Sequence, residues 1–285
     1  MTLGPDDLVL CSGTLPRDIA FRERVDAAVA GGFRGLSIWG RDYARARADG
    51  LSDADMRVLL DDHGLEVAEL DPAWWWLPGA ADTHIPDDVD TMHVFRYGAD
   101  TMFAIADALG ARSLNATDVF GGPWGVDEAA AAFAALCDRA AEHGLVVHLE
   151  GLPWSQIPDV GTAFEIVRRA GRRNGGIAVD AWHFFRAGAD FDALRAVPGT
   201  CVLAIQLDDG PAMPEDNLVR ATLHDRLLPG DGAFDLDALV ATLRAIGAVA
   251  PIGVEVFSDV LHARGAVAAA RAAGDATRRV LGAMP

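Results

Sequence analysis

Four residues with oxygen-donor side chains follow apolar runs that are predicted to be buried strands. Glu150 ends LVVHLE, Asp180 lies in IAVDAWH, Gln206 lies in CVLAIQLDD, and Glu255 lies in IGVEVFS. A buried charge is costly unless it is paired or bound to a metal. Each residue alone could cap a helix or lie on the surface just past its strand, but four on consecutive strands predict one metal site. Three carboxylates and one amide oxygen favour Mn²⁺, with Mg²⁺, Co²⁺ and Zn²⁺ as alternatives.

Two histidines lie close to these candidate ligands in the sequence. His183 follows Asp180 by three residues, where the strand ends and the side chain can turn toward a substrate. We therefore expect His183 to bind the substrate or to act in acid/base catalysis, with a structural role as the alternative. His148 precedes Glu150 by two residues and points to the same face, deeper in the barrel. We expect it to support the site by packing, with substrate contact as the alternative.

All seven tryptophans fall at or just beyond the predicted ends of the second to sixth strands. Aromatic rings there could stack on a sugar ring or line a pocket for a less polar ketone, or they could cover the barrel mouth or a subunit interface. Phe120, Phe184 and Phe185 extend the apolar character. Beyond Arg226, only Arg41 and Arg186 are weaker candidates for holding a phosphate. The tryptophans that we expect to bind the substrate are Trp39, Trp75, Trp154 and Trp182.

The elements that must position these residues alternate between short apolar strands and longer amphipathic helices. We expect strands at 8–14, 35–40, 66–72, 113–119, 145–150, 177–183, 201–208 and 251–257, and helices that include 17–30, 88–109, 127–143, 160–172, 234–246 and 260–281. Eight such units in 285 residues predict a single-domain (β/α)₈ TIM barrel over residues 1–285. An open doubly wound sheet is the alternative, but no strand is followed by GxGxxG or GxxxxGK[ST].

The composition excludes several classes of protein. A chain with 51% hydrophobic and 23% charged residues is globular, and no apolar run approaches a membrane span. A net charge of -18 argues against a nucleic-acid partner. The sequence contains no lysine, so a lysine Schiff base is excluded. The acidic amino terminus does not resemble a secretory signal, so we expect a cytoplasmic protein.

The motifs together resemble the xylose isomerase-like TIM barrel superfamily, which includes sugar-phosphate isomerases and epimerases and AP endonuclease 2-like proteins. The resemblance rests on Glu150, the DxxH of Asp180 and His183, Gln206 in QLDDG, the segment HDRLLPGDG at 224–232, and Glu255 in VEVFS. It implies that the four strand-end residues bind one Mn²⁺-like ion, that His183 contacts the substrate, and that Arg226 helps to grip substrate oxygens. It also implies a small carbohydrate-like substrate and a possible homo-oligomer.

The chemistry implied by this resemblance is removal of a proton next to a carbonyl, with the metal stabilising the enediolate. Glu150 or Glu255 would take the proton. We expect an isomerase or epimerase of carbohydrate metabolism that acts on a keto sugar, a cyclitol or a related hydroxy-ketone carrying an apolar group. Ketose epimerases usually carry histidine where this chain has Gln206, which is more similar to inosose and 3-dehydroshikimate dehydratases. A dehydratase or lyase is therefore the first alternative, and a non-catalytic sugar-binding barrel is the second.

Overall fold

Eight parallel strands form a closed barrel in the order of the chain in the computed structural model, which describes residues 3–83, 85, 90–213 and 216–282. The prediction of a single-domain (β/α)₈ TIM barrel is therefore confirmed. The strands are β1 (Leu8–Leu10), β2 (Gly35–Trp39), β3 (Glu66–Ala73), β4 (Ser113–Thr117), β5 (Val146–Glu150), β6 (Gly175–Asp180), β7 (Val202–Leu207) and β8 (Ile252–Val254).

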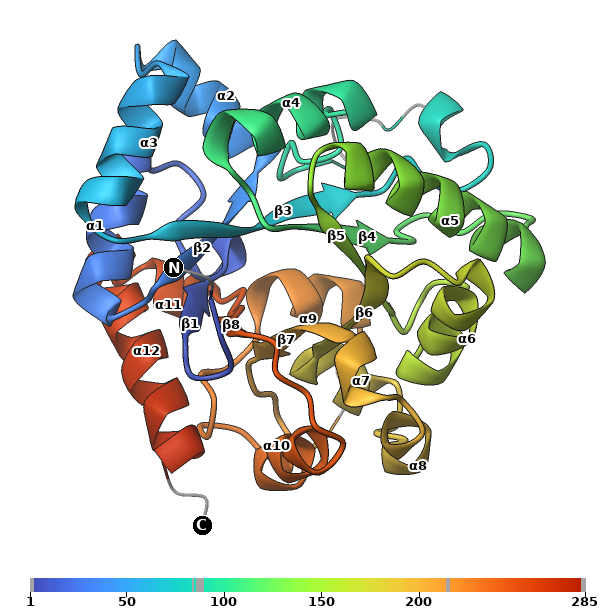
Figure 1. Cartoon of the computed structure of the whole chain (residues 1–285). Helices are drawn as coiled ribbons and strands as arrows, with labels where there is room; N and C mark the ends of the chain where they lie inside the picture. The colour runs from blue at the N-terminus through green and yellow to red at the C-terminus, as the bar shows by residue number, and fades with distance from the viewer. Residues whose placement is uncertain (1–2, 84, 86–89, 214–215, 283–285) are drawn as a thin grey trace.

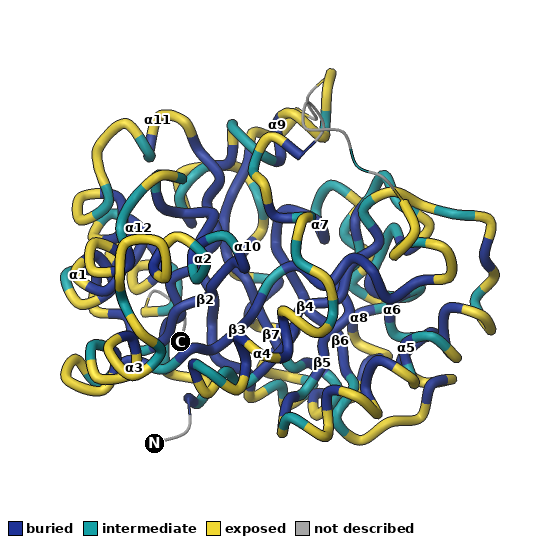
Figure 2. The backbone as a smooth tube through the Cα atoms, turned by 90° about the horizontal axis from the view of Figure 1, so that it is seen from above, coloured by how far each residue is buried: buried dark blue, intermediate teal, exposed yellow. Residues whose placement is uncertain are grey.

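Helices surround the strands on all sides, so that the strands are buried and the outer helix faces are exposed (Figures 1 and 2). At the closing seam β1 pairs with β8, and the last long helix lies beside the first one. The α-helices are α1 (Phe21–Gly31), α2 (Gly40–Ala48), α3 (Asp53–Asp62), α4 (Ala99–Leu109), α5 (Val126–Glu142), α6 (Val160–Ala170), α7 (Ala181–Arg186), α8 (Phe191–Arg195), α9 (Leu218–His224), α10 (Leu236–Ala245), α11 (Asp259–His262) and α12 (Ala266–Gly282).

The register of the strands aligns the candidate ligands at one end of the barrel. Thr117 of β4 pairs with Glu150 of β5, and Asp180 of β6 pairs with Gln206 of β7. Gln206 in turn pairs with Gly253 of β8. Because β8 ends at Val254, Glu255 lies just beyond that strand. Because the strands are parallel, these carboxyl ends all open onto the face that carries active sites in such barrels.

Two predicted helices differ from the observed ones. The helix expected at 88–109 begins at Ala99, because the Asp90 carboxylate accepts hydrogen bonds from the backbone amides of Val94 and Phe95 and holds a turn; positions 88 and 89 lie outside the described residues. The helix expected at 260–281 is divided into α11 and α12 at Gly265, whose φ of 81° is not helical.

Three further elements at the carboxyl end were not predicted as helices. The strand expected at 8–14 ends at Leu10 and is followed by a 3-10 turn, η1 (Ser12–Thr14). The short helices α7 and α9 follow β6 and β7 and contribute residues to the candidate site.

Among the described residues, no helix combines the length and the apolar character that a membrane span requires.

Candidate active site

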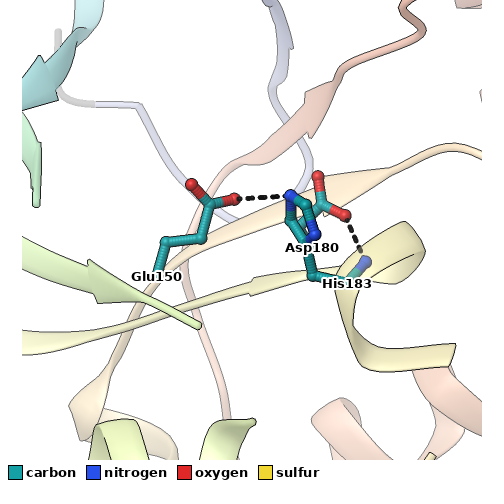
Figure 3. A group of neighbouring side chains, drawn as sticks. All are labelled: Glu150, Asp180 and His183. Atoms are coloured by element: carbon teal, nitrogen blue, oxygen red, sulfur yellow. Dashed lines mark hydrogen bonds and ion pairs between the residues drawn. The ribbon is translucent and has the colours of Figure 1, made fainter. Parts of the chain in front are cut away.

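The candidate site is built around Glu150 at the end of β5 and Asp180 at the end of β6 (Figure 3). Asp180 caps α7, since its Oδ1 accepts a hydrogen bond of 3.0 Å from the backbone amide of His183. This cap places the His183 ring beside Glu150, with 3.9 Å between Nε2 of the ring and Oε1 of the carboxylate. The three-residue spacing of Asp180 and His183 therefore lets Asp180 cap the helix that carries His183.

These three side chains fit a bound cation. Their potential ligand atoms lie within 4.8 Å of one another. Glu150 accepts a 2.9 Å hydrogen bond at Oε2 from Asn115, whereas its Oε1 is buried with no hydrogen-bond partner among the described residues. The Oε1 atom of Gln206 is buried in the same way. Buried oxygens are rarely left without a partner, and a metal ion beside Asp180 and His183 would supply one to Glu150.

The acids of the site have shifted pKa values that also fit a cation. Burial raises the pKa of Glu150 well above its ordinary value, and the neighbouring Asp180 raises it further. Burial likewise raises the pKa of Glu255, although Arg226 opposes the shift. Burial lowers the pKa of His183 to about 4, so its ring is neutral at pH 7. A divalent cation would reverse the effect of burial on the carboxyl groups.

Arg226 lies beneath the site and binds its carboxylates. Nη1 donates to Asp180 at 2.9 Å and to Asp208 at 2.6 Å, and it lies 3.7 Å from Oε2 of Glu255. The side chain is 1% exposed, and its guanidinium lies over the rings of Trp182 and Phe257. The resemblance implied a grip on substrate oxygens, but the contacts of Arg226 in the structure are with the protein's own acids.

Glu69 is a polar residue of the site that the sequence analysis missed. Its Oε1 accepts a 3.3 Å hydrogen bond from Nε2 of Gln206, and its Oε2 lies 3.1 Å from Nε2 of His148. The same nitrogen of His148 lies 3.1 Å from Oγ of Ser113. His148 is fully buried in this cluster and does not border the cavity described below, which places it as support for Gln206 rather than in contact with a substrate.

The sequence analysis also missed Asp71 of β3 and Asn115 of β4. Asp71 accepts hydrogen bonds from Nε1 of Trp39 at 2.9 Å and from Nδ2 of Asn115 at 3.1 Å. Burial, followed by the charge of Glu69, raises the pKa of Asp71 to about 7. The rule that strand ends carry the site points to Asp71, near the end of β3, but not to Asn115, which lies in the middle of β4.

A cavity of about 330 Å³ opens above these groups. It is bordered by Trp39 and Trp154, and the Trp154 ring meets that of His183 edge to face at 5.5 Å. Trp75 and Trp182, which were also expected to bind the substrate, do not border it. Trp75 is buried against Phe103 of α4, and Trp182 is fully buried with Nε1 bonded to Thr222. Both rings are core residues in the structure, because α4 packs against Trp75 and α9 packs against Trp182.

The chain matches several known proteins. The family model of the xylose isomerase-like TIM barrel matches residues 25–279. The 3-dehydroshikimate dehydratase of Pseudomonas aeruginosa is 30% identical over 265 residues, which cover 90% of this chain and 38% of that protein. The inosose isomerase of Bacillus subtilis is 34% identical over 124 residues, which cover 43% of this chain and 44% of that protein. A crystal structure of the IolI protein with a binding zinc atom has a TM-score of 0.82 at 21% identity, and the match covers 98% of this chain and 99% of that chain.

The extent of each match decides what it shows. The chain spans less than half the length of these curated relatives, and the structural likeness shows the fold. The named relatives are enzymes, a dehydratase and an isomerase. The family model covers most of this chain, from α1 to α12. Together with the closed barrel and its strand-end acids, this match shows that the chain belongs to the xylose isomerase-like TIM barrel family.

Proposed function

We propose that this chain is a divalent-metal-dependent enzyme that removes a proton next to the carbonyl group of a cyclic hydroxy-ketone. The observation that carries the proposal is the buried, unpartnered Oε1 of Glu150 in the group of Glu150, Asp180 and His183, whose potential ligand atoms lie within 4.8 Å of one another. We assign the ion to Glu150, Asp180, Gln206 and Glu255, with His183 as a neighbouring donor. The oxygen-rich set favours Mn²⁺.

The metal, when bound, would stabilise the negative charge that develops on the carbonyl oxygen as the proton leaves. The chain supplies the groups that move the proton. Glu150 borders the cavity from the end of β5, and Glu255 borders it from the segment after β8. The two carboxylates would therefore approach a bound ring from different elements of the barrel. Either carboxylate can accept the proton. His183, neutral at pH 7, can form a hydrogen bond to a substrate hydroxyl from α7.

We propose β-elimination of water, or of another β-leaving group, as the overall reaction. Gln206 at the third ligand position and the similarity to a dehydratase over 90% of the chain support this outcome. Isomerisation or epimerisation is the second candidate. It is supported by the two carboxylates at the cavity, because one could remove a proton and the other return it, and by the similarity to inosose isomerases.

The test is the metal content of the purified protein, followed by a reaction in deuterated water. We expect one equivalent of metal per chain in the wild type and none in the Asp180→Ala, Glu255→Ala double variant. With inosose as the probe, elimination gives a conjugated enone that absorbs ultraviolet light, whereas isomerisation gives a deuterated ring without that absorbance. A metal-free protein that also fails to bind added Mn²⁺ would refute the proposal and would favour a non-catalytic sugar-binding barrel.

A further inference from the structure

The cavity above the site has a polar floor and an apolar outer wall. Glu150, Glu255 and His183 are all buried and form its inner end. Phe120 and Val219 border the same cavity but are 40% and 46% exposed, so they lie at its opening to solvent. One end of the cavity therefore suits hydroxyl and carbonyl groups, and the other end suits a hydrocarbon surface.

The apolar wall is held in place by aromatic packing. Phe120 meets Phe95 at a centroid distance of 5.1 Å, and both rings meet Trp74, at 6.0 Å and 6.1 Å respectively. All three contacts are edge to face, the arrangement that stabilises aromatic pairs. The wall is thus formed before any ligand arrives. A ligand would bury the exposed part of Phe120 together with its own apolar surface.

In the described part of the cavity lining, no arginine is left unpaired to bind an anion. Arg226 is the only arginine that borders it there, and Asp180 and Asp208 match its charge. The lining also carries the carboxyl groups of Asp71 and Asp90, in addition to those assigned to the metal.

The two arginines that the sequence suggested for a phosphate bind elsewhere. Arg41 donates to the carbonyl oxygen of Met92 and to Asp18, and Arg186 lies over the rings of Trp182 and Phe234. Neither borders the cavity. A carboxylate or phosphate on the substituent, away from the metal, would thus meet no arginine of the described lining whose charge is not already matched.

We propose that the substrate is an uncharged cyclic hydroxy-ketone with an apolar substituent about the size of a benzyl group. The ring faces Glu150 and Glu255, and the substituent lies against Phe95, Phe120 and Val219. This inference rests on the proposed function for the orientation of the ring. The proposed substrate differs from 3-dehydroshikimate, the substrate of a 3-dehydroshikimate dehydratase, because 3-dehydroshikimate carries a carboxylate.

The test compares three probes: inosose, a mono-O-benzyl ether of inosose, and 3-dehydroshikimate. Binding is followed by stopped-flow quenching of tryptophan fluorescence in the Mg²⁺-loaded full chain, because Trp39 and Trp154 border the cavity. Burying one phenyl ring against the wall should make the benzyl ether bind about 10-fold tighter than inosose. 3-Dehydroshikimate should bind most weakly. The inference is overturned if 3-dehydroshikimate binds tightest or if the benzyl group confers no advantage.

Two variants test the wall and the charge separately. Phe120→Ala should remove most of the advantage of the benzyl ether over inosose. Val219→Lys should tighten 3-dehydroshikimate binding about threefold. The matched control is Val58→Lys, which adds the same charge on α3 at a position 57% exposed and away from the cavity. An equal effect of both lysines, or no effect of Phe120→Ala, would contradict the inference.

Failure of this inference is distinguishable from failure of the proposed function. The advantage of the benzyl ether depends on the wall, so it should persist in protein treated with EDTA. If metal is retained but 3-dehydroshikimate binds tightest, the substrate inference fails and the metal site stands. If no metal is retained but the benzyl ether still binds best, the proposed function fails and the preference for an apolar group stands.

Discussion

Nε2 of Gln206 donates a 3.3 Å hydrogen bond to Oε1 of Glu69, 137 residues away in the chain, on the far side of the barrel interior. Because Glu69 Oε1 is the acceptor, it holds the amide nitrogen of Gln206 toward itself and directs the amide oxygen the other way. That oxygen is the buried, unpartnered one that we assign to the metal. Glu69 is thereby a positioning residue for a ligand.

Glu69→Gln should weaken metal binding, because an amide at this position can also donate and no longer fixes the orientation of Gln206. We expect the affinity for Mn²⁺, measured by competition with a chelating dye, to fall about 10-fold. Glu66→Gln, at the outer end of the same strand, is the control and should leave the affinity unchanged. If both variants bind Mn²⁺ as the wild type does, Glu69 does not orient the ligand.

Glu150→Gln should remove activity and metal while making the metal-free protein more stable near neutral pH. Burial raises the pKa of Glu150, so ionising it in the folded chain costs free energy that glutamine does not incur. The measurement is the unfolding midpoint of EDTA-treated protein beside metal content. The exposed Glu142→Gln should change neither. A destabilised Glu150→Gln protein would mean that this carboxylate serves the fold instead.

Asp71→Asn should stabilise the metal-free protein in a pH-dependent way. The carboxyl group ionises near pH 4 in the unfolded chain but only at about 7 in the folded one. Its contribution to stability is therefore present at low pH and is lost as the pH rises through about 7. The gain from Asp71→Asn in the urea midpoint should be larger near pH 8 than near pH 5. Equal gains at both values would show that the folded pKa is not raised.

Arg226→Met should destabilise the protein by about 3–5 kcal/mol near pH 8, because it leaves the buried Asp180 and Asp208 without their partner. The loss should be smaller in the presence of Asp208→Asn, and Arg195→Met on the surface should cost little. Urea unfolding of the single and double variants measures this. A stable Arg226→Met protein with a raised KM would instead support the grip on substrate oxygens that the resemblance implied.

Trp154 and Trp75 should respond differently to substitution. Trp154 borders the cavity beside His183, so Trp154→Ala should raise KM with a small change in stability. Trp75 is buried against Phe103, so Trp75→Ala should lower the free energy of unfolding by about 3–5 kcal/mol and leave KM unchanged. Steady-state kinetics and urea unfolding on both variants separate these roles. The opposite pattern would mean that the cavity is bounded differently.

The sequence alone determined the barrel, because its signals are local. Alternating apolar runs and glycines such as Gly110 and Gly171, which end helices with a positive φ, report on neighbours within a few residues. The same logic predicts that Glu150, Asp180, Gln206 and Glu255 share one site, since polar residues at strand ends point to one face of a parallel barrel. The strand expected at 177–183 included His183, whereas in the structure β6 ends at Asp180, which caps α7.

Only the tertiary structure decided which of these groups meet and what each is free to do. The bond between Glu69 and Gln206 joins β3 to β7 across the barrel, and no local pattern reports such a contact. The burial of Trp75 and Trp182 depended on how later segments pack over them, as Thr222 of α9 does over Trp182. Arg226 borders the cavity, and its contact with a substrate stays a prediction. Its charge is matched by Asp180 and Asp208, because closing the barrel brings the ends of β6 and β7 to the loop that carries it.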